Sequence, residues 1–276
     1  MHSTTISPER QAVLDRIKNL EKAGKFDCPA ENDPPSKELL CDQVDYLIEK
    51  RSSKWKTQIA NAIADAYFKN MIKKDRLIID GINGEENLAA LKKGAVITCN
   101  HFSPFDNYIV FHCIRKHLPR KYLYKIIREG NYTTAKGLYG MFFKHCNTLP
   151  LSSNTRTMIQ FNEAVNTLLK RGESILIYPE QEMWWNYKKP RPFKLGAFKL
   201  ACKAGAPILP TFITMQDDTR LDEHGCKRQR HTLWVGEPIY PNPARSDKEN
   251  AEEMSKQAFA FCKQVYEQVY QIPLAY

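Results

Sequence analysis

Two stretches of the sequence place reactive side chains directly after apolar, strand-like runs. In the first, His101 and Asp106 follow the run Ala95–Cys99. If His101 lies in a strand-to-helix turn, Asp106 falls in the first helical turn, where its carboxylate can hold one ring nitrogen and leave the other free as a base. The same spacing also fits a structural role, because Ser103, Pro104 and Asp106 resemble a helix start with a capping box. Spacing alone leaves both interpretations open.

The second stretch lies about seventy-five residues further on. The run Ser174–Tyr178 delivers Glu180 to the carboxyl edge of the expected sheet, where open α/β sheets place their ligands. Aromatic residues follow (Trp184, Trp185 and Tyr187), and then the basic run Lys188 to Lys203. Aromatics interleaved with lysines suit nucleic-acid stacking, a lipid interface, or an anion site beside an apolar slot. Composition does not choose among these three.

The chain has 276 residues, of which 42% are hydrophobic and 26% charged, and this favours one large α/β domain with or without a helical extension. Its eight cysteines form no C-x-x-C pair, so we expect free thiols in a reducing compartment and neither a zinc ribbon nor a redox motif. The longest stretch without charge, Ala204–Gln216, is too short to span a bilayer, and Met1–Arg10 has no apolar block. We therefore expect neither a transmembrane helix nor a secretory leader.

The formal net charge is +10, and it is concentrated in two segments. Arg115–Lys136 holds seven basic residues against one acidic residue, and Lys188–Lys203 holds six against none. Such an excess favours a polyanionic partner, either nucleic acid, anionic lipid or a phosphorylated substrate. Two solvated faces are the simpler alternative.

Residues 1–75 are expected to form a helical N-terminal region. One helix begins at Ser7-Pro8-Glu9 and runs toward Gly24, a second follows a cap at Ser36 and continues to Leu47, and a third follows Ser53. The third carries an apolar stripe of residues four apart: Trp55, Ile59, Ile63, Tyr67 and Met71. Packing against a core is the default role for this stripe, and a membrane interface or a partner protein is the alternative.

Residues 76–276 alternate short β-rich runs with helical ones, which predicts a mixed, largely parallel sheet flanked by helices. The expected strands are Leu77–Ile79, Ala95–Cys99, Tyr122–Ile127, Thr148–Leu151, Ser174–Tyr178, Ile208–Thr214 and His231–Val235. The expected helices are Pro104–Lys116, Ala135–Lys144, Thr155–Arg171, Phe193–Lys203 and Asp247–Gln271. The polar stretch Gln216–Arg230 is expected to be a long loop.

Four blocks now stand in a specific order: an Asn-His-x-x-x-x-Asp turn, a strand ending in Tyr-Pro-Glu, the segment Pro192–Ala201, and Ala206–Pro210. Over roughly Leu77 to Glu237 the chain resembles the glycerolipid acyltransferase family, and it looks most like the bacterial 1-acyl-sn-glycerol-3-phosphate acyltransferases. The resemblance implies the family's α/β fold and an acyltransferase activity.

It also implies roles for individual residues. His101 would take the proton from the free hydroxyl of a lysophospholipid, and Asp106 would orient His101 and stabilise the imidazolium. The alkoxide would attack the thioester of an acyl carrier protein or coenzyme A, and His101 would then protonate the departing thiolate. Glu180 and Gly196 would contribute to substrate binding. No covalent acyl-enzyme, metal or bound organic cofactor is expected, since a thioester is already activated.

The chain departs from the family pattern at two places that concern the head group. The second block usually ends with an arginine beside its proline strand, and here the nearest one is Arg156. Where most members have Glu-Gly-Thr-Arg, Met183 replaces the arginine, so Arg191 and Lys194 are the candidates to rebuild the anion site. We expect 1-acyl-glycerol-3-phosphate as acceptor. A lysolipid with an uncharged, sugar or amino-acid head group remains the alternative.

A peripheral protein on the cytoplasmic face of the membrane is therefore expected, docked on anionic lipid by its two basic segments, with Trp184, Trp185 and Tyr187 at the interface. The rival from another class is a non-enzymatic basic protein that binds anionic lipid or nucleic acid without need of His101. No recognised nucleic-acid motif supports that rival, so no nucleic-acid partner is expected.

Overall fold

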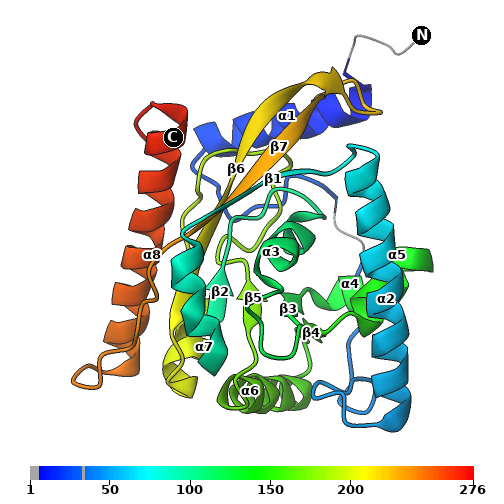
Figure 1. Ribbon diagram of the computed structural model, residues 1–276, viewed down its shortest axis with the longest axis vertical. Coiled ribbons are helices and arrows are strands. Elements are labelled where there is room, and N and C mark those ends of the chain that lie inside the picture. The colour runs from blue at the N-terminus through cyan, green and yellow to red at the C-terminus, as the bar shows by residue number, and fades with distance from the viewer. Residues whose placement is uncertain (1–5, 33–34) are drawn as a thin grey trace.

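A seven-stranded sheet runs through the centre of the molecule (Figure 1), in a computed structural model that describes residues 6–32 and 35–276. The strand order is β1-β7-β6-β2-β5-β3-β4. Neighbouring strands are parallel except β6 and β7, which are antiparallel. The strands are β1 (Ile78–Asn83), β2 (Val96–Thr98), β3 (Tyr124–Ile127), β4 (Thr148–Pro150), β5 (Ile175–Ile177), β6 (Ile208–Leu221) and β7 (Lys227–Val235). The predicted mixed, largely parallel sheet is confirmed.

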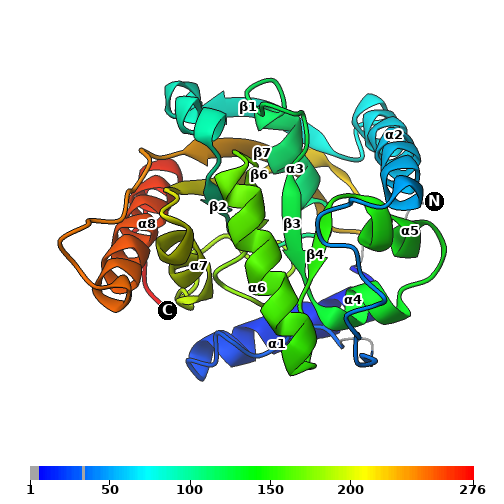
Figure 2. The same cartoon turned by 90° about the horizontal axis from the view of Figure 1, so that it is seen from below.

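Helices cover both faces of this sheet (Figure 2). They are α1 (Pro8–Lys22), α2 (Arg51–Lys73), the 3-10 helix η1 (Glu85–Lys93), α3 (Asp106–Ile114), α4 (Glu129–Thr134), α5 (Gly137–His145), α6 (Thr155–Lys170), α7 (Gly196–Ala204) and α8 (Asp247–Tyr270). In β2, Ile97 joins the core beneath α2, α3 and η1, whereas Val96 joins the core beneath α6, α7 and α8. Because both faces are buried, the central strands are continuous apolar runs.

All seven predicted strands are present, and so are the five helices predicted after residue 100, most of them one to three residues shorter. The helices η1 and α4 were not predicted. The prediction of a long loop at Gln216–Arg230 was wrong, because these residues form the outer half of the β6–β7 hairpin. Its turn is held by the Asp222 carboxylate, which accepts the backbone N–H groups of His224 and Cys226. This half of the hairpin extends beyond the core, so its polar residues gave no strand pattern.

In the N-terminal region, α1 follows Ser7 as predicted and lies beside the tip of the hairpin, where the Ser7 N–H donates to the carbonyl of His224 at 2.8 Å (Figure 1). The helix predicted from Ser36 to Leu47 was wrong. That stretch is irregular because distant groups bind its backbone: the carboxylate of Glu129 accepts the N–H of Leu39, and the hydroxyl of Ser152 donates to the carbonyl of Leu39.

The third predicted helix is α2, which begins at Arg51, two residues before Ser53. Its apolar stripe does not face the core along its whole length. Met71 is buried, but Trp55, Ile59 and Ile63 are 65%, 38% and 40% exposed. Residues four apart advance about 40° around a helix, so four such steps carry the stripe to the opposite side. No helix in the described part of the chain is long and apolar enough to cross a bilayer.

Candidate active site

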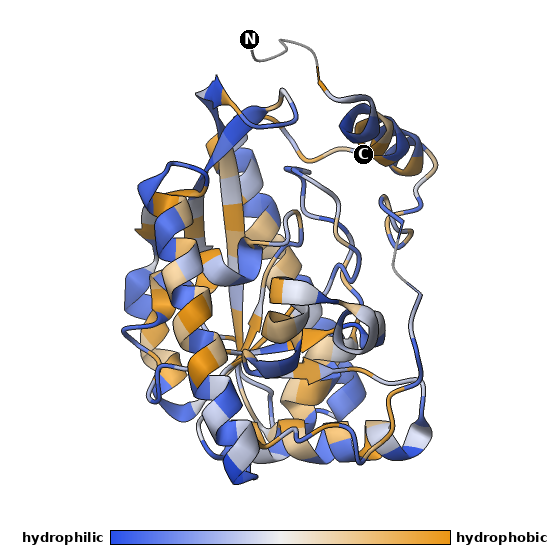
Figure 3. Cartoon of the chain, turned by 90° about the vertical axis from the view of Figure 1, so that its right-hand side faces the viewer, coloured by the Kyte–Doolittle hydropathy of each residue, from blue (hydrophilic) through white to orange (hydrophobic). Residues whose placement is uncertain are grey.

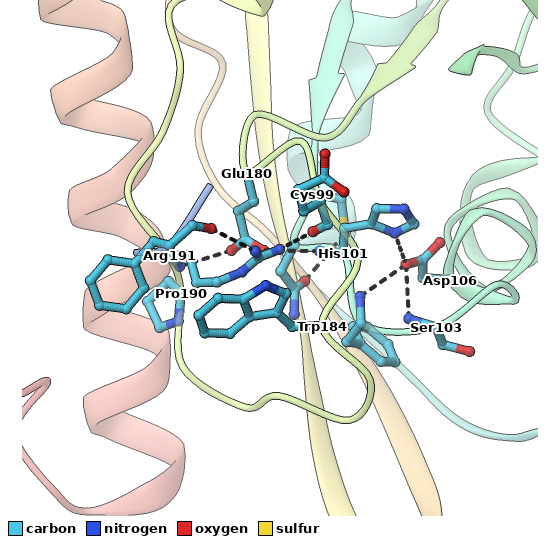
Figure 4. Close-up of polar contacts among 12 residues, drawn as sticks. Cys99, His101, Ser103, Asp106, Glu180, Trp184, Pro190 and Arg191 are labelled. Carbon is cyan, nitrogen blue, oxygen red and sulfur yellow. Dashed lines mark hydrogen bonds and ion pairs between the residues drawn. The ribbon is translucent and has the colours of Figure 1, made fainter. Parts of the chain in front are cut away.

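The candidate catalytic residues meet because β2 and β5 are parallel neighbours. Thr98 of β2 pairs with Ile177 of β5, so the two strands end at the same edge of the sheet. His101 follows β2, and Glu180 follows β5 (Figure 4). The structure therefore brings together the two stretches that sequence analysis selected.

His101 and Asp106 form a hydrogen-bonded pair. The imidazole Nδ1 lies 2.7 Å from Oδ2 of Asp106, a carboxylate that has no exposed surface. The same oxygen accepts the backbone N–H groups of Phe102 and Ser103, at 3.2 and 3.3 Å. A carboxylate at Nδ1 favours the tautomer with the proton on that nitrogen, which leaves Nε2 as the basic atom. Proton abstraction by His101 is chemically available in this arrangement.

The helix that follows begins at Asp106, not at Pro104 as predicted. Half of the expected capping box is present, because the Asp106 carboxylate accepts the N–H of Ser103, but the Ser103 hydroxyl accepts the N–H of Phe105 instead of a helical amide. The turn is fastened from its other side by Asn100, whose side chain exchanges two hydrogen bonds with the backbone of Ile213 in β6. Neighbouring strands thus fix the backbone that carries His101.

Tyr178, directly after β5, completes the surroundings of the pair. Its ring lies parallel to the imidazole of His101, with centroids 4.0 Å apart and 10° between the planes. Its hydroxyl donates to Oδ1 of Asp106 at 2.5 Å. Burial, followed by the charge of Asp106, raises the pKa of Tyr178 well above its ordinary value, so the phenol stays protonated.

Glu180 holds the backbone of His101 from the other side. Its Oε2 accepts the His101 N–H at 3.2 Å and pairs with the guanidinium of Arg191 at 3.0 Å. Arg191 also donates to the carbonyls of Phe26 and Glu182 and stacks over a tryptophan ring (Figure 4). Both members of the pair are almost fully buried. The prediction that Arg191 binds the head group was therefore wrong, because its donors are used inside the protein.

The aromatic residues Trp184, Trp185 and Tyr187 were predicted to lie at a membrane interface, and the structure places them differently. Trp184 has no exposed surface, and its indole N–H donates to the carbonyl of Cys28 at 2.9 Å. Its backbone N–H donates to the carbonyl of His101, and the hydroxyl of Tyr187 is buried. Trp185 stacks against Arg10. Trp184 therefore packs inside the protein, on the loop that supports His101, and Trp185 and Tyr187 are half-buried, so the three do not form an exposed aromatic surface.

Of the other predicted binding residues, Lys194 and Gly196 line the cavity beside His101, and Arg156 does not. Lys194 lines the cavity beside His101, is half exposed, and pairs with Asp27 at 2.9 Å. That pairing lowers the pKa of Asp27. Gly196, the first residue of α7, also lines the cavity, and a side chain at this position would meet open space. Arg156 lies exposed at the start of α6, outside the cavity lining, and the structure does not bring it to the site.

A cavity of about 1130 Å³ opens beside His101. It exceeds the roughly 300–1,000 Å³ of ordinary ligand sites. Its walls are rich in apolar and aromatic side chains from α2, α3 and α5, among them Phe68, Tyr108, Phe111, Phe142 and Phe143. Basic side chains of the lining include Arg128 and Lys194. An apolar chain with an anionic end matches this combination.

Sequence reasoning missed three residues of this cavity. Arg128 follows β3, the other neighbour of β5, and its guanidinium lies 3.5 Å from the carboxylate of Glu182. Lys125 lies within β3 and Tyr178 at the end of β5. Arg128 and Tyr178 could have been found from the sequence, because Arg128 directly follows a predicted strand and Tyr178 ends another, both at this edge of the sheet. Lys125 lies within its strand and has no such signal.

Among the described residues, no group of three or more histidine, cysteine or acidic side chains is arranged to hold a metal ion. Near the site, burial raises the pKa of the Cys99 thiol, which disfavours a nucleophilic thiolate. His101, by contrast, lines the cavity directly.

Comparison with known proteins gives the family of this region. Residues 81–214, which span both strand ends, match the family model described as Acyltransferase. That region of the chain is similar to the acyltransferase family. Within it lie the His101–Asp106 pair and Glu180, so the resemblance drawn from the sequence blocks is confirmed.

A protein of Chlamydomonas reinhardtii named 1-acyl-sn-glycerol-3-phosphate acyltransferase is 30% identical over 165 residues, covering 58% of this chain and 47% of that protein. The chain thus matches about half the length of this curated relative. The crystal structure of the 1-acyl-sn-glycerophosphate (LPA) acyltransferase PlsC from Thermotoga maritima superposes with a TM-score of 0.56 at 18% identity, over 83% of this chain and 87% of that one. Most of this chain therefore shares the fold of PlsC.

Proposed function

We propose that the protein transfers a fatty acyl group from a thioester donor to the free hydroxyl of a lysophospholipid. The observation that carries this proposal is the His101–Asp106 pair, 2.7 Å apart, beside a large apolar cavity within a region similar to the acyltransferase family. The donor is acyl carrier protein or coenzyme A carrying the acyl chain. No metal or bound organic cofactor takes part in the proposed chemistry.

The geometry supports the following reaction. Nε2 of His101 removes the hydroxyl proton as the alkoxide oxygen attacks the thioester carbonyl carbon. The imidazolium that forms is stabilised by the charge of Asp106. When the tetrahedral intermediate collapses, the carbon–sulfur bond breaks, and the imidazolium returns the proton to the thiolate. The products are an ester and a free thiol, and His101 is regenerated.

We propose 1-acyl-glycerol-3-phosphate as the acceptor. Its phosphate requires cations with hydrogen-bond donors, and Arg128 and Lys194 present such groups along the cavity. Arg191 takes no part in this site because it is buried against Glu180. Arg128 thus takes the role that the sequence blocks suggested for Arg191.

A second acceptor class is favoured by one observation. Glu182, which lines the cavity, lies beside Arg128 and provides a negative charge next to a positive one. A zwitterionic head group, such as that of lysophosphatidylethanolamine or an amino-acid lipid, presents a matching pair of charges. In that case Arg128 holds the anionic group and Glu182 the ammonium.

One assay tests both the reaction and the acceptor. Purified protein is given acyl-CoA or acyl carrier protein together with lysophosphatidate, monoacylglycerol or lysophosphatidylethanolamine, and products are identified by mass. We expect diacylated product from lysophosphatidate, and a loss of roughly 10²-fold or more in turnover for His101→Ala. His117→Ala, which alters an exposed histidine paired with Glu85, is the matched control. Transfer by a folded His101→Ala variant at the original rate would refute the mechanism.

We also propose that the protein is peripheral on the cytoplasmic membrane face, docked on anionic lipid through the α2–α5 face. This face comprises Trp55, Ile59, Ile63, Leu138 and Tyr139, all at least one-third exposed. Figure 3 views the side of the molecule on which α2 and α5 lie in Figure 1, and orange apolar residues there are interspersed with hydrophilic ones. The two helices are joined by the 3.0 Å contact between the hydroxyls of Tyr67 and Tyr139.

Charge and position both support a lipid partner. The helix α2 carries five basic residues and one acidic residue, Asp65, and α5 adds Lys144 without any acid. Burial, followed by the charges of Lys56 and Lys144, lowers the pKa of His145, so lysines of both helices lie close to this side chain. Each such charge near anionic lipid contributes about 1 kcal/mol. The same helices line the cavity, so a bilayer at this face adjoins the proposed substrate site.

The basic segment Lys188–Lys203 offers fewer unpaired exposed cations than the sequence suggested. Lys188, Lys189 and Lys194 pair with acids, and Arg191 is buried. We expect Ile63→Glu to weaken sedimentation with vesicles of equal phosphatidylcholine and phosphatidylglycerol at least tenfold. The control Ile159→Glu alters an isoleucine on α6, across the sheet, that is even more exposed than Ile63. Equal losses for both variants, or binding indifferent to salt, would contradict the assignment.

A further inference from the structure

We propose that Tyr178 is a positioning residue for the reaction, acting on His101 through its ring and on Asp106 through its hydroxyl. This inference deepens the proposed function, since it takes His101 as the base. It rests on two contacts made by one side chain: a parallel stack on the imidazole at 4.0 Å and a 2.5 Å hydrogen bond to the carboxylate.

The hydroxyl completes the hydrogen bonding of a buried carboxylate. Oδ2 of Asp106 accepts from the imidazole of His101 and from two backbone N–H groups. Within the described part of the chain, the partner that the structure gives Oδ1 is the hydroxyl of Tyr178. A buried charged oxygen without a donor is costly, so the phenol keeps the carboxylate ionised and prevents its rotation.

The ring constrains the imidazole itself. His101 is attached by a bond about which its ring can rotate, and the carboxylate fixes only one edge of that ring. A flat aromatic surface 10° from the imidazole plane restricts the remaining tilt. Nε2 therefore keeps one direction relative to the cavity, and this matters because small misplacements of a reacting group cost much of the rate.

Four titratable groups surround the Asp106 carboxylate. His101 and Tyr178 contact it directly, and Cys99 and His231 lie close enough for its charge to affect their pKa values. Burial raises the pKa of Cys99 and lowers that of His231, so both stay neutral near pH 7. Of these four groups, the two that bear on proton transfer are thus His101 and the phenol that holds its partner.

The test compares Tyr178→Phe, which keeps the ring and removes the hydroxyl, with Tyr178→Leu, which removes both. We expect a fall in kcat of about tenfold for Tyr178→Phe and about 100-fold for Tyr178→Leu, with KM for both substrates changed less than twofold. Without the phenol, the carboxylate stabilises the imidazolium more strongly, so the acidic limb of the kcat/KM profile moves to higher pH. Tyr270→Phe, which removes a hydroxyl bonded to Met215 far from the site, should change neither quantity.

A second measurement does not depend on catalysis. In histidine-labelled protein, the NMR titration of His101, identified by its absence in His101→Gln, should have a higher midpoint in Tyr178→Phe than in the unmutated protein. If the unmutated protein transfers no acyl group, the proposed function fails while this titration still tests the coupling. An unchanged titration, or an unchanged kcat and pH profile for Tyr178→Phe, would overturn the role of Tyr178.

Discussion

The carboxylate of Glu180 lies 3.2 Å from the backbone nitrogen of His101 and accepts its N–H. The segment that follows β5 therefore fixes the main chain that carries His101. Glu180 is itself held by Arg191, eleven residues further on, within a loop whose Trp184 N–H binds the carbonyl of His101. Glu180 is thus part of a support for the turn that carries His101.

The first prediction concerns this support. Replacing Arg191 with methionine leaves the Glu180 carboxylate buried without its cation, which costs about 3–5 kcal/mol. Thermal unfolding should show a large fall in Tm. Lys194→Met removes an exposed surface ion pair and should change Tm only slightly. Equal, small effects of the two substitutions would mean that the buried pair is not structural.

The second prediction concerns Asp106→Asn. The neutral amide cannot stabilise the imidazolium, and its NH₂ group faces donors that the carboxylate accepted. Turnover should fall about 10²- to 10⁴-fold, and the free energy of unfolding by about 1–3 kcal/mol. Circular dichroism and denaturant titration separate the two losses. Retained turnover in a folded variant would remove Asp106 from the mechanism.

Third, Arg128→Ala should raise the KM for lysophosphatidate tenfold or more while the KM for the thioester changes little, because its guanidinium is proposed to hold the phosphate. Lys194→Ala should have a smaller effect in the same direction, since Lys194 is half exposed and paired with Asp27. Arg156→Ala is the matched control, since Arg156 lies outside the cavity lining. If all three variants behave alike, the phosphate is bound elsewhere.

The fourth prediction is a pH dependence. Burial lowers the pKa of Lys125 relative to the unfolded chain, so the unfolded state binds more protons and this lysine costs stability at neutral pH. Lys125→Met should therefore raise Tm at pH 7. The gain should shrink as the pH approaches and passes about 10, where the unfolded lysine also loses its proton. The exposed Lys170→Met should show neither effect; a destabilised Lys125→Met protein would contradict the prediction.

Much of the sheet could be predicted because its central strands are buried on both faces and therefore appear as short apolar runs. The same runs placed His101 and Glu180 at strand ends, and parallel pairing of β2 with β5 then brought them together. This step needed only the rule that parallel strands end at one edge. It did not depend on any knowledge of the loops.

The conformation of the loops, and the contacts of the side chains in them, could not be predicted from the sequence. Arg191 and Lys194 look alike in a basic run, yet Arg191 is buried and Lys194 is half exposed. Arg191 pairs with buried Glu180 and stacks over Trp184, whereas Lys194 pairs with exposed Asp27. The residues between Ser36 and Leu47 had helical spacing, but their backbone groups are bound by side chains more than eighty residues away. The spacing of apolar residues within a segment does not show which distant side chains will bind its backbone.

The bond from Arg191 to the carbonyl of Phe26 joins parts of the chain that are 165 residues apart, and the bond from Trp184 to Cys28 joins parts 156 apart. Contacts with so large a sequence separation close long loops and tend to form late in folding. The sheet can assemble its strands before the N-terminal segment arrives, but the turn that carries His101 gains its full support only afterwards. Catalytic competence should consequently appear after most of the native secondary structure during refolding.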